Sequence, residues 1–116
     1  MIWFAEEPER ESLRSYLENK LGVKTKDSSV PAPEGTTRVE GFSIRRPYPQ
    51  GVDDVVILEE TNAYYFNEGY IVEGLGKPGS DLTRTSILGI SNGSENLHAT
   101  ISTGKSGIYF LIGKSQ

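Results

Sequence analysis

The chain has 116 residues, a length typical of one domain, and its hydrophobic fraction of 35% and charged fraction of 24% are typical of a globular protein. The absence of cysteine excludes disulfides, thiolate metal sites and thiol catalysis, and a single histidine argues against a zinc site. Twelve Lys and Arg against sixteen Asp and Glu give a net charge of −4, which argues against a general nucleic-acid binder.

The first predicted element is a helix over about residues 8–21. Acidic residues precede its apolar part, as the positive end of a helix dipole favours, and Gly22 follows as a stop signal. Its apolar residues have the spacing i, i+3, i+4 and i+8 and share one stripe: Leu13, Tyr16, Leu17 and Leu21.

After the helix, residues 23–37 are polar and rich in proline, so we expect a loop there. Val39–Arg46 then alternates as a strand, with Phe42 and Ile44 on one face and Gly41 as a candidate bulge. Val55–Leu58 is a β-branched apolar run, which favours a central strand. Residues 63–72 resemble a hairpin with a three-residue loop ending at a glycine.

In the last third of the chain, predicted strands alternate with predicted turns. Strands are predicted at Ser86–Ser91, Leu97–Thr103 and Ile108–Ile112, with turns at 92–96 and 104–107. The sequence therefore predicts a single α+β domain over residues 1–116. One N-terminal helix packs on a predominantly antiparallel sheet of about six or seven short strands, within a β region over about 38–114.

Charge is segregated along the chain. Residues 47–76 hold six carboxylates and no Lys or Arg, together with several aromatic residues. Carboxylates steer basic partners and tyrosines provide large contact areas, so this segment predicts a docking surface for a basic protein. The alternative is that the acids point in different directions and several tyrosines are core. The candidate partner-binding residues are Asp53, Asp54, Glu59, Glu60, Tyr64, Tyr65, Glu68, Tyr70 and Glu73.

A catalytic site is the alternative interpretation. Histidine is the residue type suited to proton transfer near neutral pH, and His98, the one histidine of the sequence, could with Arg84 and Lys105 serve a small metal-independent nuclease or phosphoryl-transfer enzyme. The acid pairs that flank Val55–Leu58 lack the lysine that metal-dependent nucleases place two residues after an acid. No metal or cofactor is predicted.

The leading hypothesis is a small acidic, non-enzymatic binding protein that blocks a basic protein partner. Immunity proteins (antitoxins) against nuclease toxins and phage-type inhibitors of defence nucleases are similar in size and charge. A third class is an assembly module whose exposed β-edge pairs with a second copy. No apolar run reaches the length of a membrane span and no signal peptide is recognisable, so we expect a cytoplasmic protein.

Overall fold

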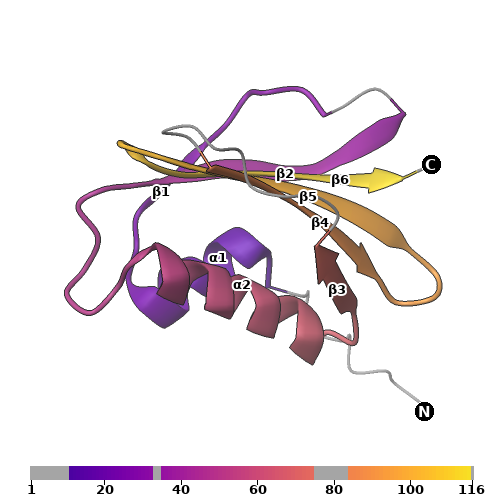
Figure 1. Cartoon of the computed structure of the whole chain (residues 1–116), viewed down its shortest axis with the longest axis horizontal. Coiled ribbons are helices and arrows are strands. Elements are labelled where there is room, and N and C mark those ends of the chain that lie inside the picture. The colour runs from indigo at the N-terminus through magenta and orange to yellow at the C-terminus, as the bar shows by residue number, and fades with distance from the viewer. Residues whose placement is uncertain (1–10, 33–34, 75–83, 116) are drawn as a thin grey trace, which may run out of the picture.

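The computed structural model describes residues 11–32, 35–74 and 84–115, which form two helices and six strands. In chain order they are α1 (Leu13–Leu21), β1 (Thr25–Asp27), β2 (Thr36–Arg45), α2 (Asp54–Asn67), β3 (Ile71–Gly74), β4 (Arg84–Ser91), β5 (Asn96–Gly104) and β6 (Gly107–Ser115). The strands pair antiparallel in the order β1-β2-β6-β5-β4-β3. Both helices lie on one face of the sheet (Figure 1), so the predicted α+β fold is confirmed.

α1 forms where the apolar stripe predicted it, but it begins later than residue 8. Ser12 is its N-cap and accepts a hydrogen bond from the backbone N–H of Ser15. Residues 8–10 of the predicted helix lie outside the described residues, and Glu11 is not helical. Gly22 ends the helix with φ 71°, a left-handed conformation that glycine adopts without a steric penalty.

α2 occupies a segment for which the sequence predicted strands. The strand predicted at Val55–Leu58 and the first arm of the hairpin predicted over 63–72 are wrong, because Asp54–Asn67 is one helix. Asp53 caps it by accepting a hydrogen bond from the N–H of Val56 at 2.8 Å. The buried residues of α2 recur every four positions: Ile57, Thr61 and Tyr65. Burial of this stripe outweighs the weak helix propensity of β-branched and aromatic residues.

The predicted loop over 23–37 is also wrong in part. Thr25–Asp27 forms the edge strand β1, which pairs with the stretch of β2 from Phe42 to Ile44. β2 itself begins at Thr36, and its register shifts between Arg38 and Glu40 rather than at Gly41. The other strands and turns follow the prediction. In β5 the buried and exposed residues alternate as expected, with His98 on the face opposite the core.

The core lies between the sheet and the two helices. The rings of Phe42 and Phe110 stack with centroids 4.6 Å apart, on strands that pair directly. Leu13 and Leu17 of α1 and Ile57 of α2 join them, and all five side chains are at most 2% exposed. Neither described helix is long and apolar enough to span a membrane.

Candidate functional site

Most of the acidic residues predicted to bind a partner lie on or beside α2, and several have structural roles. The carboxylate of Asp53 caps the helix. Asp54 accepts a hydrogen bond from the hydroxyl of Tyr48 at 2.8 Å and pairs with the guanidinium of Arg46 at 2.7 Å. Burial, followed by this bond to Asp54, raises the pKa of the Tyr48 hydroxyl, so it stays a proton donor. The charge of Asp54 is therefore largely compensated within the protein.

The remaining acids are separated by the fold. Glu60 accepts a hydrogen bond from the hydroxyl of Tyr16 on α1 at 3.2 Å, and Glu68 is half-buried just after α2. Glu59 is exposed, and no group in the described part of the chain pairs with it. Glu73 is exposed on β3, where its register with Gly89 places it on the same side of the sheet as His98, away from the helices.

Two of the three tyrosines proposed as anchors are part of the core. Tyr65 is 4% exposed and Tyr70 is 7% exposed, and burial raises the pKa of Tyr65. The hydroxyl of Tyr70 donates to Glu95 at 2.9 Å. Tyr64 donates to the backbone carbonyl of Glu11 at 2.6 Å and packs its ring against Tyr16. These tyrosines hold the helices and the sheet together, and the side chains of Tyr65 and Tyr70 are buried rather than presented to a partner.

The surface that α2 presents outward carries different residues. Four of its five exposed residues have the spacing i, i+4, i+7 and i+11 and form what we call the outer stripe: Val55, Glu59, Asn62 and Phe66. Phe66 is 76% exposed and Val55 is 60% exposed. Ile71 of β3 is 65% exposed, and with Asn62 and Phe66 it lines a groove of about 350 Å³.

The outer stripe was not predicted, because the sequence of this segment was interpreted as strands. The spacing of Val55, Asn62 and Phe66 places them on one face only if the segment is a helix. Large apolar side chains at more than half exposure on a helix with a packed opposite side are a feature of interaction surfaces.

Of the three alternative catalytic residues, His98 lies far along the sheet from the backbone positions of Arg84 and Lys105. His98 pairs with Gly89 and Gly113 on its neighbouring strands, whereas Arg84 pairs with Thr103. At about 3.3 Å per residue, Thr103 lies roughly 16 Å along β5 from His98. Lys105 lies in the turn beyond that far end of the strand. A general acid–base pair acting on one phosphate needs hydrogen-bond distances, so this arrangement gives no support to a shared site.

The described residues contain no group of three or more His, Asp or Glu side chains that could hold a metal ion. No family model matches the chain, and no curated protein or solved structure matches it.

Proposed function

We propose that this protein is a binding domain that docks on a basic protein partner through the outer stripe of α2 and the neighbouring Ile71. The observation that carries the proposal is Phe66, an aromatic side chain 76% exposed on a helix whose opposite side is packed in the core. Buried aromatic anchors provide much of the binding energy at protein interfaces. Ile71 lines the same groove as Phe66 and extends its apolar area. Val55 is a separate exposed apolar side chain at the other end of the stripe, beyond Asn62 and Glu59.

Charge supports a basic partner. Residues 47–76 contain six acids and no Lys or Arg, so no lysine or arginine of this segment offsets the carboxylates near the stripe. Glu59 lies within the stripe, one turn from Val55, and Asp53 is exposed at the start of the same helix. A partner with Lys and Arg around an apolar depression would complement this surface in both shape and charge.

The inhibitor hypothesis is the finer form of this proposal. A basic enzyme such as a nuclease toxin presents the positive surface that the outer stripe would attract, and a bound domain could obstruct its active site. Action as an immunity protein or as a phage-type inhibitor of a defence nuclease remains a prediction from size and charge, as does action in the cytoplasm.

The first experiment uses the full chain as bait in an extract of its native host, followed by mass spectrometry and purification of each captured protein. We expect a basic partner whose affinity falls at least tenfold with Phe66→Ser. Tyr109→Ser is the matched control, because Tyr109 is 45% exposed on the other face of the sheet. A captured protein that binds Phe66→Ser as well as the parent, or that is lost equally with Tyr109→Ser, would contradict the proposal.

Binding kinetics across a salt series then test the role of charge. Glu59→Lys should slow association most at 0.01 M salt, where the Debye length is about 30 Å, and much less at 0.15 M, where it is about 8 Å. Glu73→Lys makes the same charge change on the opposite side of the sheet and should have a smaller effect. Phe66→Ser should mainly accelerate dissociation. Association that is independent of salt and of Glu59→Lys would place the interface elsewhere.

A further inference from the structure

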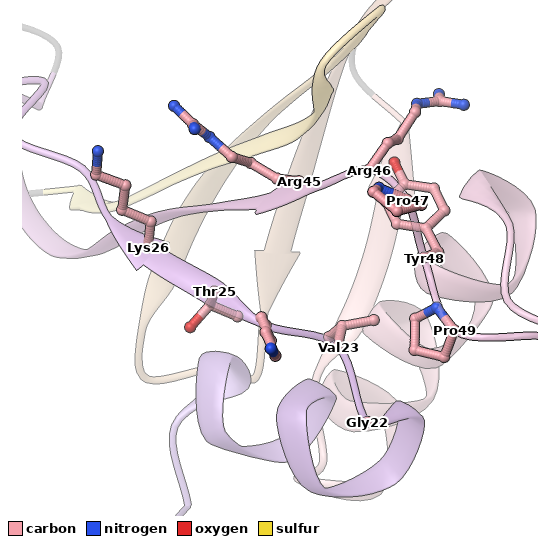
Figure 2. A pocket seen from close by; sticks show the side chains of 10 residues that line it. Gly22, Val23, Thr25, Lys26, Arg45, Arg46, Pro47, Tyr48 and Pro49 are labelled. Carbon is pink, nitrogen blue, oxygen red and sulfur yellow. The ribbon is translucent and has the colours of Figure 1, made fainter.

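A second surface feature of opposite charge lies near the start of α2. Two segments distant in sequence, residues 22–26 and 45–49, line an open surface cavity of about 530 Å³ (Figure 2). The pairing of β1 with β2 brings them together, since Thr25 lies opposite Ile44. The volume is within the range of about 300–1,000 Å³ that small-molecule sites occupy.

Four cationic side chains line this cavity, which we call the basic pocket: Lys24, Lys26, Arg45 and Arg46. The chain has sixteen carboxylates and only twelve Lys and Arg, yet none of the described carboxylates lines the pocket. Arg46 pairs with Asp54 and lies over the ring of Tyr48 at 5.1 Å. In the part of the chain that the structure describes, no carboxylate pairs with Lys24, Lys26 or Arg45.

Lys26 and Arg45 are positioned to act on the same group. Lys26 lies opposite Ser43 on the paired strand, and Arg45 follows Ser43 by two residues, so both side chains project from the same face of the sheet. Figure 2 shows them extending toward the same side of the ribbon. Diagonal neighbours of this kind are about 7–8 Å apart at the backbone, a separation that a bound anion can bridge. Without one, the two positive charges repel each other.

Apart from Thr25, the rest of the wall is largely apolar, and backbone hydrogen bonds hold it in place. Val23 is 4% exposed, and Pro47, Tyr48 and Pro49 line the opposite side. The backbone here is fixed at its ends by hydrogen bonds from the N–H of Arg46 to Ser106 at 2.9 Å and from the N–H of Val52 to Pro49 at 3.0 Å. An apolar wall beside a few convergent charged groups is the usual composition of a small-molecule site.

We propose that the basic pocket binds a small organic anion. Its apolar or aromatic body lies against Pro47, which is exposed, and its anionic oxygens lie between Lys26 and Arg45. The guanidinium of Arg45 can donate two parallel hydrogen bonds to a phosphate or to a carboxylate, which is the chemistry the two ligand classes share. This site is independent of the outer stripe, because it uses different residues and the opposite sign of charge.

The test is a titration of the full chain at low salt, followed by calorimetry and by the backbone amide NMR signals. The probes are phenyl phosphate, benzoate, inorganic phosphate and neutral benzyl alcohol. We expect saturable binding of phenyl phosphate or benzoate with a Kd of about 1 mM or tighter, stronger than that of the other two probes. The shifted amide signals should include Val23 and Thr25. Comparing phenyl phosphate with benzoate distinguishes phosphate from carboxylate ligands.

Variants locate the anion. Arg45→Gln and Lys26→Gln should each weaken binding by about tenfold, because each removes a charge-assisted contact. Lys105→Gln makes the same charge change in the exposed turn between β5 and β6 and should leave binding within twofold. All three positions are exposed, so melting temperatures should confirm that the variants fold. An absence of saturable binding, equal binding of inorganic phosphate and phenyl phosphate, or equal effects of Lys105→Gln and Arg45→Gln would overturn the proposal.

Discussion

At the scale of single residues, Gly107 shows how one position controls the approach of two strands. It begins β6 with φ 148°, and a Cβ added there would lie 1.9 Å from the backbone oxygen of Ile44. Gly107→Ala must therefore displace β2 or distort the turn, and we expect it to lower the free energy of unfolding by about 3 kcal/mol or more. Urea denaturation followed by far-UV circular dichroism measures this loss.

Gly104 provides the matched control at the other end of the same turn. A Cβ there meets nothing within 4 Å, and its φ is not in the left-handed region. Gly104→Ala should change the free energy of unfolding by no more than about 0.5–1 kcal/mol. Equal losses for the two alanine variants would show that close approach to β2 is not what requires glycine at 107.

Glu40 gives the molecule a pH-dependent contact between β2 and α1. Its carboxylate accepts hydrogen bonds from the N–H groups of Leu13 and Arg14, at 3.3 Å and 3.2 Å, at the start of α1. Burial nevertheless raises the pKa of this carboxyl above its ordinary value of 4.5. At pH values between the ordinary pKa of the unfolded chain and the raised pKa of the folded protein, the folded protein binds more protons than the unfolded chain. This group therefore makes the free energy of unfolding fall as the pH rises through that range.

Glu40→Gln isolates this effect, because the amide oxygen still accepts a hydrogen bond but does not titrate. We expect the stability of the parent, relative to that of Glu40→Gln, to decrease between pH 4 and pH 7. Urea denaturation at several pH values measures the difference between the two proteins, in which contributions from other groups largely cancel. A difference that stays constant or increases with pH would contradict this account.

At the scale of elements, the N-cap of α2 shows whether Asp53 stabilises the helix through its hydrogen bond or through its charge. Asp53→Ala should lower the free energy of unfolding by about 0.5–2 kcal/mol, because the N–H of Val56 loses its acceptor. Asp53→Asn keeps a good N-cap and removes only the charge, so it should retain most of the stability. Thermal and urea denaturation compare the two variants. If Asp53→Asn is as destabilised as Asp53→Ala, the charge matters more than the cap.

The elements also show which parts of the fold the sequence could predict. Strand β5 follows a two-residue alternation, strands β4 to β6 are separated by turns marked by glycine and asparagine, and α1 has a clear apolar stripe with a glycine stop. Val55–Leu58 is apolar at every position, and a run that short has no measurable period. Only the spacing of Ile57, Thr61 and Tyr65 identifies the helix, and it is visible only when the segment is considered as a whole.

The candidate surfaces were harder to predict for a related reason. Whether Tyr65 faces the core or the solvent depends on the helical period of α2, so the error in that element carried over to its tyrosines. The basic pocket combines residues 22–26 with residues 45–49, and only the pairing of β1 with β2 unites them. Because residues 23–37 were predicted to be a loop, the pairing of β1 with β2 was not predicted.

At the scale of the whole molecule, both helices and the sheet share one core, so their stabilities should be coupled. Leu17 of α1 is fully buried in the same cluster as Ile57 of α2 and Phe110 of β6. Leu17→Ala should lower the free energy of unfolding by roughly 2–5 kcal/mol, because it removes buried surface and leaves a cavity. Far-UV and near-UV circular dichroism should report a single transition that moves as a unit, since the tyrosines around α2 depend on the same core.

Phe66→Ala is the informative control for that measurement. Phe66 is 76% exposed, and alanine has the higher helix propensity, so the variant should be within about 0.5 kcal/mol of the parent. Such a result would indicate that this aromatic side chain adds nothing to folding, which agrees with its proposed role in docking. A loss comparable to that of Leu17→Ala would instead mean that Phe66 supports the fold, and its exposure would no longer favour an interface. Equal stability of Leu17→Ala and the parent would contradict the docking of α1 in the shared core.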